Sequence, residues 1–236
     1  MKTALITGAS RGIGRSIAKA FASAGYHVFA VAKTSWNALL TLQEETGCTP
    51  ILADVSDKDQ VSSLYNTIFQ QCDHMDVLIN NAGISHIGLL QDMTVEEWDH
   101  IINTNLRSAF LCTRQALPSM IRNQTGCIVN ISSMWGERGA SCEVAYSASK
   151  GGLNAFTKAL AQEVAPSGIR VNAIACGAID TDMNRFLSAD ERSDLEAGIG
   201  LGRFGLPNEV ADLALYLCSE QSSYLTGQVI TLDGCF

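Results

Sequence analysis

The sequence lacks the features that define several large classes of protein. No run of about 18 apolar residues predicts a membrane-spanning helix. Lysine and arginine total 16 against 24 acidic residues, for a net charge of −8, and they form no basic cluster, which argues against nucleic-acid binding. The eight cysteines form no C-x-x-C pair, and no Cys/His cluster has metal-ligand spacing, so no metal site is expected. Because the chain begins at once with a strand pattern, we expect no signal peptide. Most cysteines lie in apolar segments, as buried free thiols do, so we expect a reduced, cytoplasmic protein.

What the sequence does contain is a regular alternation of strand and helix patterns. This alternation predicts an α/β protein with a single-domain Rossmann-type doubly wound fold, a parallel seven-stranded sheet with helices on both faces. The predicted strands cover 3–7, 27–32, 49–53, 76–80, 126–132, 169–176 and 228–232, and the predicted helices cover 13–24, 36–46, 57–71, 94–122, 145–165 and 207–218. One domain over 1–236 is expected, because nothing resembles a linker or a repeat.

One segment, 180–206, interrupts the alternation. It is rich in charge and glycine and follows a predicted strand, at the edge where ligands bind in open α/β sheets. We interpret it as a substrate lid, with a pair of ordinary surface helices as the alternative.

A glycine-rich turn joins the first predicted strand to the first predicted helix. Its residues are Gly8, Ser10, Arg11, Gly12, Ile13 and Gly14, in the spacing G-x-x-x-G-x-G. A helix N-terminus offers free N–H groups to a pyrophosphate, and glycines let the backbone approach it closely. The turn therefore predicts a dinucleotide site.

Tyr146 and Lys150 lie four residues apart in YSASK, at the start of a predicted helix. Side chains at i and i+4 share one helix face, so an ammonium would stand beside a phenol and lower its pKa. We therefore expect Tyr146 to exchange a proton near neutral pH.

Together these motifs resemble the short-chain dehydrogenase/reductase family. TGASRGIG (7–14) resembles its cofactor loop, and NNAG (80–83) resembles its turn after the fourth strand. Asn105, Ser133, Tyr146 and Lys150 match its catalytic tetrad, including the 13-residue step from serine to tyrosine, which favours Ser133 over Ser132. The resemblance runs from about residue 2 to residue 234.

The resemblance implies a role for each member of the tetrad. Tyr146 would protonate the carbonyl oxygen, Ser133 would position it, and Lys150 would also bind the nicotinamide ribose. Asn105 would hold a water through its backbone carbonyl. The implied cofactor contacts are Gly8, Ser10, Arg11, Gly12, Ile13, Gly14, Lys33, Asp54, Val55, Asn80, Asn81, Ala82, Gly83, Tyr146, Lys150, Gly177, Ile179 and Thr181.

The end of the second strand indicates which cofactor is preferred. An acid that would select NAD falls at Ala32 in the family pattern, so it is missing. Lys33 and Arg11 could instead pair with a 2′-phosphate. We therefore predict NADP(H), with NAD(H) as a possible substitute.

The substrate is less tightly defined by the resemblance. The stretch 126–183 is most similar to 3-oxoacyl-[acyl-carrier-protein] reductases of fatty-acid synthesis, but Gln124 and Ser167 stand where well-known members carry arginine, leaving Arg122 and Arg170 to dock an acidic carrier. The segment from Met134 to Val144 resembles reductases of a 5-aminopentanone group on elongation factor P. There Trp135 would wall the pocket and Glu143 would meet an ammonium.

Further alternatives are a small-ketone or hydroxysteroid dehydrogenase and a cofactor-binding regulatory protein without catalysis. The chain departs from the family in having Cys176-Gly177 for Pro-Gly and Gly234-Cys235-Phe236 for Gly-Gly with a longer tail. The first change frees a φ angle beside the nicotinamide. The resemblance implies a homotetramer or homodimer.

Overall fold

A computed structural model describes residues 1–185 and 187–236 as one α/β unit. Seven parallel strands form one sheet in the order β3-β2-β1-β4-β5-β6-β7. The strands are β1 (Thr3–Thr7), β2 (His27–Ala32), β3 (Thr49–Leu52), β4 (Val77–Asn80), β5 (Gly126–Ser133), β6 (Ile169–Cys176) and β7 (Val229–Leu232). The Rossmann-type doubly wound fold is confirmed, and each predicted strand agrees to within one residue at either end.

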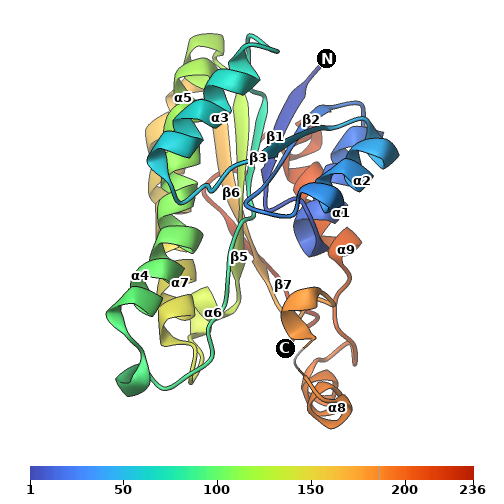
Figure 1. Ribbon diagram of the computed structural model, residues 1–236, viewed down its shortest axis with the longest axis vertical. Helices are drawn as coiled ribbons and strands as arrows, with labels where there is room; N and C mark the ends of the chain where they lie inside the picture. Colours follow the sequence, from blue (N-terminus) through green and yellow to red (C-terminus); the bar gives the residue numbers. More distant parts are fainter. Residues whose placement is uncertain (186) are drawn as a thin grey trace.

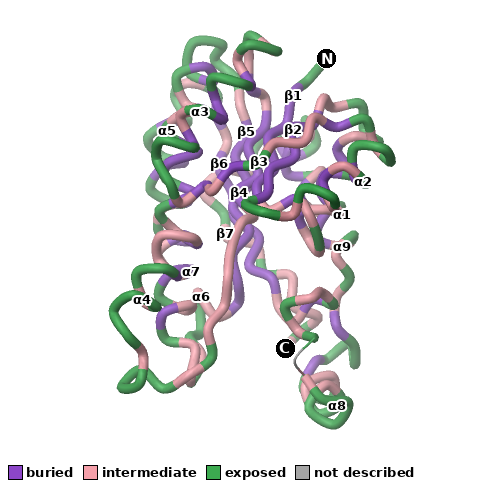
Figure 2. The backbone as a smooth tube through the Cα atoms, in the orientation of Figure 1, coloured by how far each residue is buried: buried purple, intermediate pink, exposed green. Residues whose placement is uncertain are grey.

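Helices cover both faces of the sheet (Figure 1). They are α1 (Gly12–Ser23), α2 (Trp36–Thr46), α3 (Lys58–Phe69), α4 (Val95–Ile102), α5 (Ser108–Asn123), α6 (Trp135–Arg138), α7 (Val144–Val164), α8 (Ala189–Gly198) and α9 (Pro207–Leu217). One apolar cluster packs α1, α2 and α9 on one face, and a second packs α3, α5 and α7 on the other. The central strands are buried between these layers, whereas the edge strands β3 and β7 are only partly buried (Figure 2).

Alternation along β1 shows how one strand serves both clusters. Ala4 and Ile6 point into the cluster with α1, whereas Leu5 points into the cluster with α3 and α5, and all three side chains are fully buried. Successive side chains of a strand point to opposite faces, so a strand covered on both sides must be apolar throughout. This requirement is why short continuous apolar runs identified the strands.

The predicted helix over 94–122 is interrupted. Thr94 caps α4 by accepting a hydrogen bond from the Glu97 amide, and Glu97 returns the contact to the Thr94 amide. A π-helical turn, Asn103–Arg107, then separates α4 from α5. Such turns widen the helix by one residue and reorient the side chains that follow.

The segment 180–206 contains a 3-10 turn, Asp182–Asn184, and α8; of these positions, residue 186 lies outside the described residues. None of the residues of α8 is buried (Figure 2). At the lower end of Figure 1, α8 lies on one side and α4 and α6 lie on the other.

In the described residues no helix is both long and apolar enough to cross a membrane. Within the same residues, no group of three or more His, Cys, Asp or Glu side chains could hold a metal ion.

Candidate active site

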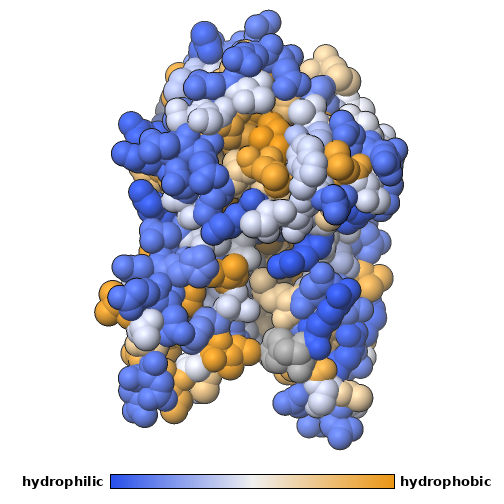
Figure 3. Space-filling view, in the orientation of Figure 1, coloured by the Kyte–Doolittle hydropathy of each residue, from blue (hydrophilic) through white to orange (hydrophobic). Residues whose placement is uncertain are grey.

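A cleft of about 790 Å³ lies at the carboxyl edge of the central strands. It opens between the two lobes at the lower end of the molecule (Figure 3). Except for Asn80, every residue predicted to contact cofactor or substrate lines this cleft. Three members of the tetrad also line it, and the fourth, Asn105, lies behind its wall. The topology explains this convergence, because parallel strands bring their following loops to a single edge.

The glycine turn forms one end of the cleft. Gly8 and Gly12 have left-handed φ angles of 67° and 53°, which glycine adopts without strain. A Cβ on Gly14 would lie only 2.3 Å from the Gly8 carbonyl oxygen. Helix α1 begins at Gly12, and among the described residues no side chain caps its first turn, which also carries no acid. The turn therefore presents unpaired backbone N–H groups to the cleft and suits a pyrophosphate.

The NNAG turn braces this end. Thr7 accepts hydrogen bonds from the Asn81 and Ala82 amides at 3.0 Å each, and Asn81 Nδ2 donates to the Thr7 and Gly8 carbonyls. Asn80 does not fit the predicted cofactor role. Its buried Nδ2 donates to Asn130 and Thr113, away from the cleft.

The cofactor-selecting corner contains an ion pair that the sequence did not reveal. Lys33 Nζ lies 2.8 Å from Asp54 Oδ2. Partial burial of Asp54 opposes its ionisation, but hydrogen bonds from Lys33 and Ser56 outweigh that and lower its pKa. Ala32 ends β2 beside this pair, and the exposed Arg11 lines the same part of the cleft.

Ser133, Tyr146 and Lys150 meet at the other end. The Ser133 hydroxyl lies near enough to Tyr146 to lower the pKa of its phenol, and Lys150 Nζ lies 5.7 Å from the Tyr146 ring centroid. Ser132 is engaged elsewhere, donating to Asn154 Oδ1 at 2.6 Å. The geometry therefore favours Ser133 over Ser132 as the partner of the tyrosine.

The protonation of this group differs from the expectation. Burial raises the pKa of Tyr146, and the group that lowers it is the Ser133 hydroxyl rather than Lys150. Lys150 is itself buried and donates to the Ile131 carbonyl at 2.8 Å. Burial lowers the pKa of Lys150 to about 8, so its ammonium can release a proton close to neutral pH.

Asn105 acts from behind the cleft wall. Its side chain exchanges two 2.8 Å hydrogen bonds with the backbone of Ile84 and donates to Ser149 Oγ at 3.0 Å. A Cβ on Gly83 would lie 3.3 Å from Asn105 Oδ1 and 3.4 Å from Lys150 Nζ. The π turn therefore places Asn105 where it ties the loop after β4 to α7, next to the lysine.

Cys176 and the residues after it line the cleft beside the tetrad. Burial raises the pKa of the Cys176 thiol to about 12, so it is a neutral wall group. A Cβ on Gly177 would lie 2.6 Å from Asp233 Cα, so a side chain there would clash with the backbone. Thr181 faces the glycine turn, since a Cβ on Gly12 would lie 3.2 Å from its methyl carbon.

The remaining wall includes residues that sequence reasoning missed. Trp135 and the half-buried Glu143 line the cleft, and burial raises the pKa of Glu143. Missed lining residues include Met183, Asn184, Leu187, Leu195, Phe204 and Phe236. No motif marks the first five, although their position within the predicted lid was an available signal; Phe236 lies in the segment Gly234-Cys235-Phe236, where the chain departs from the family.

The expectation that Arg170 docks a carrier protein is wrong. Its guanidinium donates to the carbonyls of Leu217, Ser219 and Leu225 and to Ser222, anchoring the start of β6 within the chain. Arg122 is exposed near the end of α5, at the edge of the sheet opposite the cleft.

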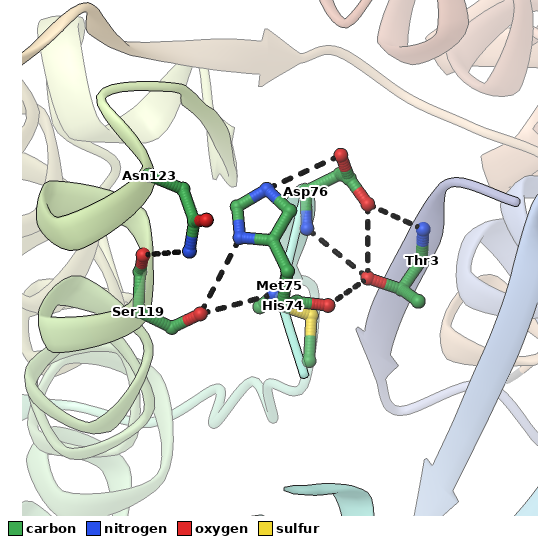
Figure 4. A network of polar contacts seen from close by, with 6 residues as sticks. All are labelled: Thr3, His74, Met75, Asp76, Ser119 and Asn123. Atoms are coloured by element: carbon green, nitrogen blue, oxygen red, sulfur yellow. Dashed lines mark hydrogen bonds and ion pairs between the residues drawn. The ribbon is translucent and has the colours of Figure 1, made fainter. Parts of the chain in front are cut away.

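A second polar cluster, also at the opposite edge, has the composition of a hydrolytic triad (Figure 4). Ser119 Oγ lies 3.4 Å from His74 Nδ1, and His74 Nε2 lies 3.3 Å from Asp76. However, Ser119 is 1% exposed, and Asp76 accepts two hydrogen bonds from Thr3. A nucleophile needs access to its substrate. This cluster therefore joins β1, β4 and α5 and has no catalytic role.

The site and the fold define a dinucleotide-dependent oxidoreductase, and comparison with known proteins agrees. The family model described as "Enoyl-(Acyl carrier protein) reductase" matches residues 8–236, and the chain belongs to the short-chain dehydrogenase/reductase family. Members of this family bind nicotinamide cofactors.

Individual relatives cover almost the whole chain. A 3-oxoacyl-[acyl-carrier-protein] reductase of Chlamydia trachomatis is 44% identical over 238 residues, covering 99% of this chain and 96% of the relative. The corresponding enzyme of Aquifex aeolicus is 40% identical with the same coverage. An uncharacterized oxidoreductase of Bacillus subtilis is 42% identical over 239 residues, covering 99% of this chain and 98% of the relative. These relatives support an enzyme and not a regulatory protein.

Proposed function

We propose that this protein reduces a ketone to a secondary alcohol with NADPH. The observation that carries the proposal is the grouping of Ser133, Tyr146 and Lys150 in the same cleft as the glycine turn. Desolvation raises the pKa of Tyr146, so its phenol stays protonated at neutral pH, which suits a general acid.

Each residue of the site has a separate role in the proposed reduction. A bound nicotinamide supplies the hydride, whose two electrons reduce the carbonyl carbon. The Ser133 hydroxyl orients the carbonyl oxygen, and Tyr146 Oη gives that oxygen its proton. Lys150, with a pKa of about 8, is placed to hold the proton that restores the phenol. Asn105 fixes the loop against which Lys150 packs.

The NADPH preference rests on the selecting corner. Ala32 leaves the 2′ position without an acid on β2, and Arg11 and Lys33 both line that part of the cleft. A 2′-phosphate would have to draw Lys33 away from Asp54. Arg11, in contrast, is exposed and makes no ion pair with an acidic side chain among the described residues.

The first candidate substrate is a 3-oxoacyl group on acyl carrier protein. Its support is the group of relatives named for that reaction, at 40–44% identity over nearly the full chain. Such a substrate places a carbonyl two carbons from the thioester, and the carrier itself stays outside the cleft.

A second candidate is a ketone that bears a primary amine, such as the 5-aminopentanone group on elongation factor P. Glu143 is a half-buried carboxyl in the substrate end of the cleft, where an ammonium could pair with it. Three arginines near the substrate end of the opening are paired within the chain, which disfavours an acidic carrier there. These pairs are Arg138–Asp233 at 3.2 Å, Arg185–Asp182 at 2.7 Å and Arg192–Asp180 at 3.0 Å.

NADPH consumption tests both candidates. Acetoacetyl-acyl-carrier protein, the acetoacetyl thioester of coenzyme A and 5-amino-2-pentanone are compared, with a crotonyl thioester as a control for reduction of a C=C bond. Tyr146→Phe should lower kcat by roughly 10²–10⁴-fold while leaving NADPH binding intact. Unchanged kcat in this variant would refute the mechanism. Glu143→Gln should impair the amino ketone alone, and equal losses on all substrates would exclude the second candidate.

Three further properties belong to the same proposal. The segment 180–206 acts as the substrate lid, because Met183, Leu195 and Phe204 line the cleft while α8 itself buries no residue. The protein works in the cytoplasm, where its eight free thiols would stay reduced.

Assembly as a homodimer or homotetramer is the third property. An apolar groove between α5 and α7 offers a face for a second copy, lined by Leu106, Phe110, Ala155 and Phe156, with Phe110 46% exposed. Light scattering on a Phe110→Asp variant tests it, since a like charge from each copy would weaken the contact.

A further inference from the structure

The segment Asp233–Phe236 turns back toward the cleft. Gly234 and Cys235 follow each other in the left-handed region, with φ angles of 69° and 66°. Cysteine is rarely found there, so the turn carries a conformational cost that its surroundings must outweigh. The result is that Phe236 lines the cleft.

Contacts on one side tie this segment to α6. Arg138 donates to the Phe236 backbone oxygen and pairs with Asp233 at 3.2 Å. Beside them, Thr231 Oγ1 donates to Glu137 at 2.8 Å. The segment lies near α6 at the lower end of the molecule (Figure 1).

Contacts on the other side tie the segment to the end of the proposed lid. The Gly200 amide donates to the Cys235 carbonyl, and the Leu201 amide donates to the Gly234 carbonyl, both at 3.0 Å. A Cβ on Gly234 would lie 2.9 Å from the Ile199 methyl carbon, so this approach is close. The segment therefore bridges α6 and the chain that follows α8.

The Phe236 ring meets Trp135 edge to face. Their centroids are 5.8 Å apart and the rings are inclined at 87°, a favourable arrangement for two aromatic groups. The Trp135 amide in turn donates to Ser133 Oγ at 3.2 Å. The aromatic pair is thus fixed relative to the hydroxyl proposed to orient the carbonyl.

We propose that Phe236 is a specificity-determining residue: braced against Trp135, its ring limits the length of the group that a ketone can carry beside its carbonyl. The inference rests on the proposed ketone reduction. Two neighbouring elements hold the backbone of this segment, and Trp135 packs against the ring, so the ring is costly to displace and a longer group would clash with it. In apolar pockets one methylene changes selectivity by roughly 10–200-fold.

The test compares 3-oxoacyl thioesters of N-acetylcysteamine with four and eight carbons. For Phe236→Ala, the ratio of kcat/KM for the longer over the shorter thioester should rise at least about tenfold, while NADPH affinity stays within about twofold. Phe236→Tyr keeps the wall, and Tyr224→Ala removes a fully exposed aromatic ring, so both should keep the parent ratio. A ratio within twofold of the parent for Phe236→Ala would overturn the inference.

A second variant covers the case in which Phe236→Ala does not fold. Arg138→Gln releases the Phe236 backbone without changing the ring, and it should raise the same ratio by a smaller factor. An unchanged ratio in Arg138→Gln, with Phe236→Ala unfolded, would also overturn the inference.

Failure of the proposed function can be distinguished. If the parent protein reduces neither thioester, binding of 2-butanone and 2-octanone to the NADPH-saturated protein is measured by quenching of tryptophan fluorescence. Phe236→Ala should then favour 2-octanone over 2-butanone by at least about tenfold more than the parent does. An unchanged preference would reject the role of Phe236 independently of turnover.

Discussion

The Lys33–Asp54 ion pair predicts an unusual effect of removing an acid: Asp54→Asn should strengthen the preference for NADPH. In the structure the ammonium is held 2.8 Å from the carboxylate, so a 2′-phosphate has to compete for it. Asparagine keeps an oxygen that can still accept the hydrogen bonds from Ser56, which protects the local turn. The change therefore removes mainly the charge.

The magnitude follows from Coulomb's law. Two unit charges about 4 Å apart interact by about 1 kcal/mol in water and about 4 kcal/mol at an effective dielectric constant near 20. The Lys33 side chain is 59% exposed, so the lower figure applies. A gain of about 1 kcal/mol corresponds to roughly a fivefold rise in the ratio of kcat/KM with NADPH to kcat/KM with NADH.

The assay is steady-state kinetics with both cofactors and one ketone. Any contact between Asp54 and the adenosine affects both cofactors equally and cancels in the ratio. The rise should shrink in a Lys33→Gln background, and it should largely vanish near 1 M salt, where the Debye length is about 3 Å. A ratio that stays constant or falls in Asp54→Asn, or a rise of equal size without Lys33, would refute competition for the lysine.

Three other perturbations test separate parts of the site. Ala32→Asp should move cofactor preference toward NADH through repulsion of the 2′-phosphate, with the uncharged Ala32→Asn as its control; equal ratios for the two variants would argue against a charge effect. Gly14→Ala should destabilise the fold by about 1–3 kcal/mol and weaken NADPH binding, because the new methyl would lie 2.3 Å from the Gly8 carbonyl oxygen. Urea unfolding measures the first effect and cofactor titration measures the second. Parent-like values in both measurements would contradict the steric argument. The buried Lys150 has its pKa lowered from 10.5 to about 8, so the unfolded chain binds the extra proton between these values and stability rises with pH across that window. Between pH 7 and pH 9 the free energy of unfolding of the parent, measured in urea, should rise by about 1 kcal/mol relative to that of Lys150→Met. If the free energies of unfolding of the two proteins vary with pH in parallel, the buried charge of Lys150 is ruled out as the cause.

Much of this architecture is predictable from the sequence because its signals are local. Strands covered on both faces must be continuously apolar, so β1, β5 and β6 were identified closely from their runs alone. The glycine turn and YSASK likewise carry their chemistry in short motifs. The parallel topology then brings them to one cleft.

Features that depend on distant contacts were not predictable in this way. Helix α6 has only four residues, and its contacts to Asp233 and Thr231 come from the far end of the chain. The pKa of Tyr146 depends on burial in the folded chain, which helical spacing does not report. Arg170 is an anchor and not a docking residue because the chain after α9 folds onto it.

Because distant parts of the chain form the cleft, the amount of folded protein depends on the supply of cofactor. The walls come from residues 8–14, from the middle of the chain and from 176–184 together with later residues, so the site exists only when the entire sheet is assembled. A ligand that binds only the native state stabilises it by about 2.7 kcal/mol at one hundred times its dissociation constant. Cellular depletion of the dinucleotide would thus shorten the lifetime of the enzyme as well as slow its turnover, coupling protein abundance to redox state.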